Sequence, residues 1–313
     1  MDGPSAHTDT PGWQSGDALC NGLKLHWEAT GPESGEPMLM VMGLGCQLIQ
    51  WPDVLCLDLA KRGFRVIRFD NRDAGLSDTV DRQLRFSLRR DYVRVRLGLR
   101  PGPANYLLHD MAADTVGLMD ALGLKRAHLV GVSMGGMIAQ LTAGTFPDRV
   151  ASLCSIMSGT NHPWVRQTRI DLLLRLASRP PDLQRDTIVA RQAETFRLIG
   201  SPLYPTSLED RRAFAGRAFD RAFRPGGTLR QMHAIVATGS FEKLLPNITA
   251  PTQIIHGTDD PLMRTICGRR SASMIRGAKL ELIKGMGHDC PKVLMPRWAE
   301  LIAANAARAS SPP

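Results

Sequence analysis

A serine stands between two glycines in the segment Gly131-Val132-Ser133-Met134-Gly135. The apolar run AHLVGV precedes this segment and the helix-like run MGGMIAQLTAGTF follows it. A G-x-S-x-G pattern between a strand and a helix presents the serine hydroxyl on a sharp turn. The first amide groups of the helix favour negative charge that develops beside them. The pattern predicts that Ser133 is a nucleophile; the alternative is an ordinary glycine-rich turn with a solvent-facing serine.

A serine hydroxyl attacks well only when a base takes its proton, and histidine is the usual base. Among the eight histidines, His288 follows the last predicted strand, in the loop KGMGHD at 284–289. Loops after the carboxyl ends of parallel strands share one edge of the sheet with the Ser133 turn. We therefore predict that His288 is the base. The remaining candidates are expected in the N-terminal tail (His7), packed within strands (His128, His256) or in an inserted segment where they could line a pocket (His162, His233).

A third group, an acid, should fix the tautomer of the histidine and stabilise its charged form. The loop HGTDDP at 256–261 follows another predicted strand and supplies two carboxylates, Asp259 and Asp260. Both are candidates on their position alone.

Together, these motifs resemble the α/β-hydrolase superfamily. In that superfamily the acid usually stands three residues after a glycine and just before a proline-containing segment, which favours Asp260 in Gly257-Thr258-Asp259-Asp260-Pro261. The order Ser133, Asp260, His288 along the chain is the order that this fold uses.

The resemblance also implies an oxyanion hole made of two backbone N–H groups, those of Met134 and Leu44. Leu44 lies in the glycine-rich loop Met42–Cys46. The superfamily commonly has His-Gly at the start of this loop, where this chain has Met42-Gly43. The backbone donor of Leu44 is unaffected by the change, but no role can be given to that histidine side chain.

The run DNRDAGLS at 70–77 resembles the D-x-R-G-x-G-x-S turn of the superfamily, and departs from it at Asp73, where glycine is usual. We interpret Asp70, Arg72 and Ser77 as residues that brace this loop through hydrogen bonds. With Met42-Gly43, the run is most similar to the methylesterase branch that acts on aclacinomycin-type polyketide esters. The resemblance covers residues 18–158 and 248–306, and the segment between them carries no motif.

The resemblance implies a serine hydrolase that cleaves a carboxylic ester in a small-molecule substrate, with no metal or organic cofactor. Hydrolysis of a lactone, a carbon–carbon bond or an amide, and acyl transfer, use the same three side chains and stay open. A more remote alternative is a non-catalytic protein that binds a small ligand on the same fold.

Short, almost wholly apolar runs alternate with helix-like segments, as in an α/β fold with a mostly parallel central sheet flanked by helices. The predicted strands are 38–42, 65–69, 127–132, 150–157, 252–256 and 279–283. The predicted helices are 51–62, 109–122, 134–146 and 292–308.

The alternation stops near residue 158 and resumes near 248, with arginine-rich helical segments between them. We therefore predict a hydrolase core at 18–158 and 248–306, interrupted by a helical cap at 159–247. Residues 81–108 form an additional excursion near its rim. Residues 1–17 and 307–313 are expected to be flexible tails.

The formal net charge is +9, and two segments hold all of the excess. Residues 81–100 contain seven arginines and residues 161–240 contain thirteen, whereas the remainder of the chain is close to neutral. Few aromatic residues accompany these arginines, which argues against a nucleic-acid partner. The arginines either form solvated helix faces or steer an acidic substrate towards the site.

The six cysteines show no C-x-x-C pair and no metal-type spacing. No apolar run approaches the roughly 18 residues of a membrane span, and the N-terminus lacks the basic start and apolar stretch of a signal peptide. We expect a reduced, cytoplasmic enzyme without a membrane span, and the sequence does not indicate its oligomeric state.

Overall fold

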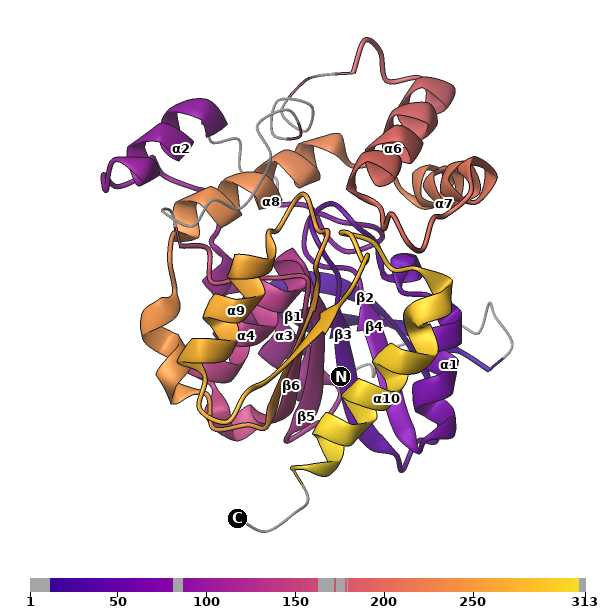
Figure 1. Cartoon of the computed structure of the whole chain (residues 1–313), viewed down its shortest axis with the longest axis vertical. Helices are drawn as coiled ribbons and strands as arrows, with labels where there is room; N and C mark the ends of the chain where they lie inside the picture. Colours follow the sequence, from indigo (N-terminus) through magenta and orange to yellow (C-terminus); the bar gives the residue numbers. More distant parts are fainter. Residues whose placement is uncertain (1–11, 81–86, 163–171, 173–177, 179, 310–313) are drawn as a thin grey trace.

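The computed structural model describes residues 12–80, 87–162, 172, 178 and 180–309, and these contain one eight-stranded sheet (Figure 1). The strands are β1 (Gln14–Cys20), β2 (Leu23–Thr30), β3 (Glu36–Val41), β4 (Phe64–Phe69), β5 (Ala127–Val132), β6 (Val150–Ile156), β7 (Thr252–Gly257) and β8 (Lys279–Ile283). Their order in the sheet is β1-β2-β4-β3-β5-β6-β7-β8. The first two pairings are antiparallel and the others are parallel, which confirms the predicted fold class.

Helices cover both faces of the sheet (Figure 1). The helices of the described residues are α1 (Asp53–Lys61), α2 (Leu88–Arg96), α3 (Leu108–Ala121), α4 (Met134–Thr145), α6 (Arg185–Ile199), α7 (Leu208–Arg221), α8 (Pro225–Thr238), α9 (Thr265–Met274) and α10 (Met295–Ala307). Helices α1 and α10 pack together on one face, and α3, α4 and α9 lie on the other.

Strand β3 shows why the central strands are apolar along their whole length. Side chains alternate between the two faces of a sheet, and here both faces are covered. Leu39 and Val41 belong to the core under α3 and α4, whereas Met38 and Met40 belong to the core under α1 and α10. All four side chains are fully buried.

The six strands predicted from the sequence are present, but the hairpin of β1 and β2 was not predicted. Asn21 and Gly22 connect the two strands, and both have positive φ, as a two-residue hairpin turn requires. The tail predicted at 1–17 is therefore wrong from Gln14 onwards. The reason is burial: Ala18 and Cys20 of β1 enter the core beneath α3.

The helices α6, α7 and α8 come from the segment between β6 and β7, and they lie beyond one edge of the sheet (Figure 1). Helix α6 packs on α7, and α8 packs on α2 of the 81–108 excursion. Part of the arginine-rich helical region expected between 158 and 248 lies outside the described residues, namely 163–171, 173–177 and 179.

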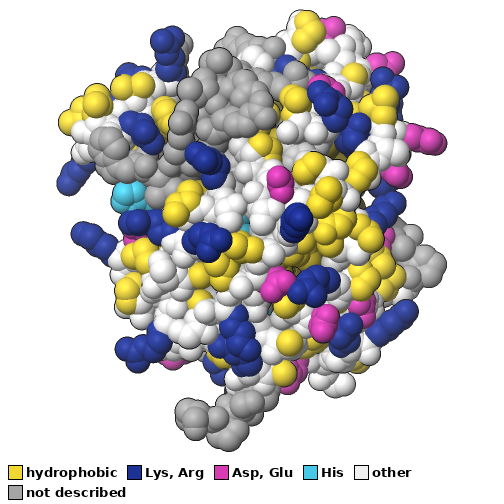
Figure 2. All heavy atoms as spheres, in the orientation of Figure 1, with side chains coloured by type: hydrophobic (Ala, Val, Ile, Leu, Met, Phe, Trp, Pro, Cys, Tyr) yellow, Lys and Arg dark blue, Asp and Glu magenta, His cyan; other side chains and the backbone are white. Residues whose placement is uncertain are grey.

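Basic side chains are spread over the visible surface among apolar and acidic ones, without a continuous basic patch on the face that Figure 2 shows. Within the residues that the structure covers, no helix has the length and apolarity to cross a bilayer.

The start of α4 lies directly against the end of β3. A Cβ atom added at Gly135 would overlap the Val41 carbonyl oxygen and lie 2.7 Å from that of Met42. Both obstacles are backbone atoms of the sheet edge, which move only if the sheet moves. Only glycine therefore lets the helix start this close to β3.

We expect Gly135→Ala to lower the free energy of unfolding by about 1–3 kcal/mol or more through overpacking, as measured by urea denaturation. Gly216→Ala in α7 is the matched control, because its added methyl meets only the guanidinium of Arg185 at 3.0 Å, the far end of a flexible side chain. That control should raise stability by up to about 1 kcal/mol through helix propensity. Equal stability of the two variants would contradict the close approach.

Candidate active site

Ser133 occupies the turn between β5 and α4 with a strained backbone, φ 53° and ψ −120°. A positive φ is rare for a residue with a side chain and costs about 1–3 kcal/mol unless its surroundings enforce it. Two hydrogen bonds do so here. The Ser133 N–H donates to the Ile156 carbonyl at 3.0 Å, and Ser158 Oγ donates to the Ser133 carbonyl at 2.7 Å. The serine is thereby held at the N-terminus of α4.

The predicted base and acid meet this serine in one continuous chain of hydrogen bonds. His288 Nε2 lies 2.9 Å from Ser133 Oγ, and His288 Nδ1 lies 2.7 Å from Asp260 Oδ2. Because an ionised carboxylate only accepts hydrogen bonds, Nδ1 carries the proton and Nε2 is free to accept one from the serine. Three residues 28 to 155 positions apart are thus brought together.

The two candidate acids have different surroundings. Asp260 is 5% exposed, and its second oxygen accepts hydrogen bonds from the N–H groups of Leu262 (2.9 Å) and Met263 (2.7 Å). Asp259 is exposed, and its carboxylate accepts a hydrogen bond from the Gly285 N–H at 3.0 Å. Only Asp260 contacts His288, in agreement with the choice that the resemblance favoured.

A second histidine, His256, lies on the far side of Asp260, with Nε2 at 3.7 Å from Oδ2. Its Nε2 donates to the Met263 carbonyl at 2.7 Å. Burial lowers the pKa of His256 more than Asp260 and the Met263 carbonyl raise it. His256 is therefore neutral at neutral pH, and the hydrogen bond of Asp260 Oδ2 is made with His288 Nδ1.

The loop that carries His288 is held by the segment that follows α6. The His288 N–H donates to the Ile199 carbonyl at 2.7 Å. Ser201 Oγ donates to Asp289 Oδ1 at 2.5 Å and accepts a hydrogen bond from the Gly287 N–H at 2.8 Å. Burial raises the pKa of Asp289. Residues of the predicted cap therefore hold the loop that carries His288.

The predicted oxyanion loop lies beside the serine. A Cβ atom added at Gly43 would be 3.3 Å from the Ser133 Cβ and 3.9 Å from its Oγ, so the backbone of this loop passes next to the hydroxyl. Leu44 follows Gly43 directly, and Met134 follows Ser133 as the first residue of α4. Both predicted N–H donors thus belong to segments adjacent to the Ser133 hydroxyl.

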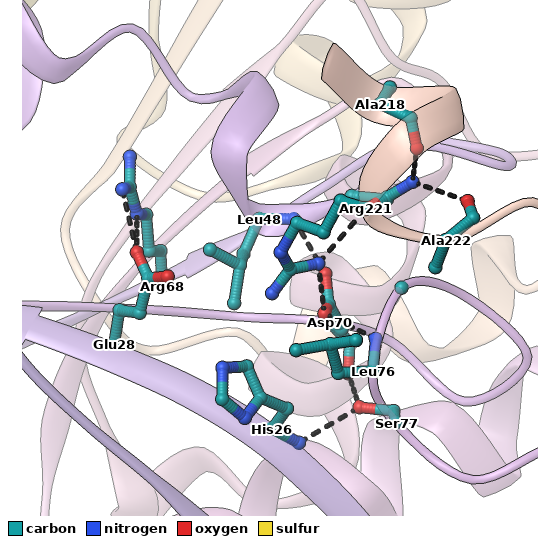
Figure 3. A network of polar contacts seen from close by, with 12 residues as sticks. His26, Glu28, Leu48, Arg68, Asp70, Leu76, Ser77, Ala218, Arg221 and Ala222 are labelled. Carbon is teal, nitrogen blue, oxygen red and sulfur yellow. Dashed lines mark hydrogen bonds and ion pairs between the residues drawn. The ribbon is translucent and has the colours of Figure 1, made fainter. Parts of the chain in front are cut away.

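The loop at 70–77 is braced as the sequence predicted, with Asp70 at its centre (Figure 3). The buried carboxylate of Asp70 accepts hydrogen bonds from the N–H groups of Leu48 (2.7 Å) and Leu76 (2.9 Å). Ser77 Oγ donates to the Asp70 carbonyl at 2.6 Å. The fourth partner is Arg221 of α7, whose guanidinium lies 2.7 Å from Asp70 Oδ2.

Asp73, where the superfamily usually has glycine, also braces the 70–77 loop. It has a positive φ of 68°, the conformation in which glycine is favoured. Its buried carboxylate accepts two hydrogen bonds from Arg230 of α8 (2.6 and 2.9 Å) and one from the Tyr106 hydroxyl at 2.7 Å. Arg224 donates to the Gly75 carbonyl at 2.6 Å. The departure from glycine thus supplies an anchor for α8.

These contacts change the interpretation of the arginine-rich segment. Arg221, Arg224 and Arg230 form neither a solvated face nor a free charge at an entrance, because each is bonded to the 70–77 loop. By contrast, Arg197 forms an exposed helical pair with Glu194 (2.7 Å), as expected for a solvated face. Sequence reasoning missed the anchoring role, although the unusual residue at Asp73 was a signal for it.

Two further histidines, His128 and His233, have structural partners. His128 is packed within β5 as predicted, with Nδ1 at 2.9 Å from Ser152 Oγ. His233 of α8 lies 3.1 Å from Asp91 of α2, a pair that fastens the excursion to the cap. His7 is outside the described residues. No group of three or more His, Cys, Asp and Glu with the geometry of a metal site is found in the part of the chain that the structure describes.

The model of the α/β-hydrolase fold family matches residues 36–290, which include the Ser133 turn, Asp260 and His288. The chain belongs to this family.

Three known proteins illustrate the range of this family. Rhodomycin D methylesterase DnrP of Streptomyces peucetius is 25% identical over 307 residues, which cover 90% of this chain and 95% of the methylesterase. The solved structure of the meta-cleavage product hydrolase CumD from Pseudomonas fluorescens IP01 has a TM-score of 0.70 at 20% identity, covering 94% of this chain and 97% of CumD. The enol-lactonase from Burkholderia xenovorans LB400 has a TM-score of 0.71 at 20% identity, covering 93% and 99% of the two chains. At this identity the two solved structures show a shared fold alone.

The buried His256 predicts how the stability of this α/β-hydrolase depends on pH. Its pKa is lowered in the folded chain, so below its ordinary value of about 6.5 the unfolded chain binds a proton that the folded chain does not. The stability linked to His256 is therefore present above pH ~6.5 and is lost as the pH falls.

Urea unfolding at pH 7.5, 6.5 and 5.5 should show this loss, and His256→Gln should make the decline shallower whatever its absolute stability. The urea m-value serves as the control and should not change. A decline as steep in the variant as in the wild type would contradict the assignment.

Proposed function

We propose that this chain is a serine hydrolase that cleaves a carboxylic ester through an acyl-enzyme intermediate on Ser133. The observation that carries the proposal is the unbroken hydrogen-bonded chain from Asp260 through His288 to the strained serine at the start of α4. A nucleophile, a base and an orienting acid in this order form the arrangement used for acyl transfer.

In the proposed reaction, Ser133 Oγ attacks the acyl carbon while its proton passes to His288 Nε2. The N–H groups of Leu44 and Met134 stabilise the oxyanion that forms on the acyl oxygen. His288 then gives the proton to the leaving alcohol, and Asp260 stabilises the charged imidazolium in between. In the second half, His288 takes a proton from water, the hydroxide attacks the acyl carbon, and Ser133 leaves with that proton as the free acid is released.

The similarity to rhodomycin D methylesterase supports an ester as the substrate class, over 90% of this chain. The two solved neighbours, named a meta-cleavage product hydrolase and an enol-lactonase, share only the fold. Hydrolysis of a lactone or a carbon–carbon bond and acyl transfer are therefore outcomes that a substrate panel distinguishes. The panel spans acyl length, aryl esters, methyl esters, lactones, charged esters and a diketone for carbon–carbon cleavage, each with and without an added alcohol as acyl acceptor, and Ser133→Ala is the blank.

The division of the chain is part of the proposal. The core comprises 14–158 and 248–307, because β1 begins at Gln14 and α10 ends at Ala307, and 159–247 forms a cap over the carboxyl edge of the sheet. Two sets of contacts support the cap: the 199–201 segment lies on the His288 loop, and α7 and α8 lie on the 70–77 loop. The cap therefore borders the serine, and we expect it to select the substrate.

Ser133→Ala should abolish hydrolysis of short p-nitrophenyl esters, because no other group in the proposed reaction can form the acyl-enzyme. A fluorophosphonate probe should label the wild-type protein and leave the variant unlabelled, and near-identical circular dichroism spectra would show that the fold is kept. Undiminished hydrolysis by the alanine variant would exclude Ser133 as the nucleophile.

Asp260→Asn should lower kcat by about four orders of magnitude, because an amide no longer fixes the productive tautomer of His288. Asp259→Asn is a matched control one residue away. It removes the same charge from an exposed side chain that does not touch His288, and kcat should stay within about threefold of the wild type. The opposite ranking of the two variants would move the orienting role to Asp259.

A further inference from the structure

The predicted oxyanion loop is a tight turn whose geometry depends on one peptide group. The Cys46 N–H donates to the Gly43 carbonyl at 3.2 Å, and Gly45 has a positive φ of 66°. A positive φ at the third residue is the mark of a type II turn. Rotating the central Leu44–Gly45 peptide by half a turn would give a type I turn with a negative φ at Gly45. Glycine permits both orientations, so the hydrogen-bond partner of the central peptide selects between them.

The group that holds this peptide comes from the cap. The Gly45 N–H, which belongs to that central peptide, donates to Gln231 Oε1 of α8 at 2.8 Å. The other end of the same amide, Gln231 Nε2, donates to the Arg72 carbonyl at 2.8 Å. Gln231 is 0% exposed, so its amide bridges two core loops where water cannot replace either partner. A rotated central peptide would leave Oε1 buried without this donor, which is costly.

Helix α8 is seated firmly enough to place this amide. Arg230, the neighbour of Gln231, forms the two-hydrogen-bond contact with Asp73. At Gly227 the helix comes so close to the loop that an added Cβ atom would overlap the Asp73 carbonyl oxygen. Thr228 lies against Gly45, 2.8 Å from the position that a Cβ atom would take there. These contacts fix the first turns of α8 on the two loops that Gln231 joins.

We propose that Gln231 is a positioning residue for the oxyanion hole: from the cap, it holds the turn that carries the Leu44 N–H. The inference rests on the proposed ester hydrolysis and deepens it, because the site is then complete only with the cap docked. Oxyanion donors act at 2.7–3.1 Å from the charge that develops. A small relaxation of the turn therefore reduces the stabilisation of the transition state more than it reduces the binding of the ester.

Gln231→Leu replaces the amide by an apolar group of similar size and removes both hydrogen bonds. We expect kcat for p-nitrophenyl acetate to fall about 10- to 100-fold. This decrease is smaller than the decrease in kcat that follows the loss of a whole oxyanion donor. KM should change by less than about threefold, because the interaction strengthens only in the transition state. The melting temperature is measured alongside to identify a variant that fails to fold.

Gln231→Glu keeps the inference testable if the leucine variant does not fold. When protonated, its carboxyl group offers a carbonyl oxygen to the Gly45 N–H and a hydroxyl to the Arg72 carbonyl, as glutamine does. Burial raises the pKa of such a group. The kcat of this variant relative to wild type should therefore rise as the pH is lowered from 8 to 6, which a purely structural defect would not produce.

Gln253→Leu is the matched control, since Gln253 is a 5% exposed glutamine of β7 whose amide bonds to the Ile254 and Lys279 carbonyls. This variant loses a buried amide of the same kind at a position away from the turn. Its kcat should stay within about twofold of the wild type. Wild-type kcat in Gln231→Leu, or an equal loss in both leucine variants, overturns the inference and leaves the proposed function standing. A wild-type protein inactive on every ester, or an active Ser133→Ala, overturns both.

Discussion

The close contact between α4 and the carboxyl edge of the sheet is the constraint on which the candidate site depends. Gly135 lets the helix start against the Val41 and Met42 carbonyl groups. The chain then has to reverse within one residue, which forces Ser133 to a φ of 53°. The strain points the hydroxyl out of the turn and towards His288, 2.9 Å away. Without this contact the serine would be an ordinary helix N-terminal residue without an approach to the base.

Two buried carboxylates decide how the cap sits on the core. Asp70 and Asp73, whose carboxylates are fully buried, each pair with an arginine of the proposed cap, Arg221 and Arg230 respectively. A buried ion pair adds little net stability over an apolar contact, but removing one partner costs about 3–5 kcal/mol. Such pairs therefore favour one docked arrangement over others. The docked arrangement is also the one that places the cap beside the oxyanion turn.

Much of the sheet was predictable because its central strands are buried on both faces and therefore read as unbroken apolar runs. The edge hairpin was missed since one of its faces is solvated: Leu19 of β1 is 76% exposed between buried Ala18 and Cys20. Helix α9 was missed too, because its segment TICGRRSASM contains only two large apolar side chains, Ile266 and Met274. The formation of these elements depends on contacts with the sheet, such as those of α9 with β7.

The sequence by itself identified Ser133 as the candidate nucleophile, because a strand, a sharp turn and a helix are local features that a few neighbouring residues specify. It also determined which loops meet, since parallel strands bring their carboxyl ends to one edge. The position of the loop left two adjacent acids open and the family motif favoured Asp260, which the structure brings to His288. Tertiary structure alone joined Gln231 to Gly45 across 186 positions. Such contacts follow from how buried polar groups find partners in the packed chain, and no periodicity or motif in the sequence records them.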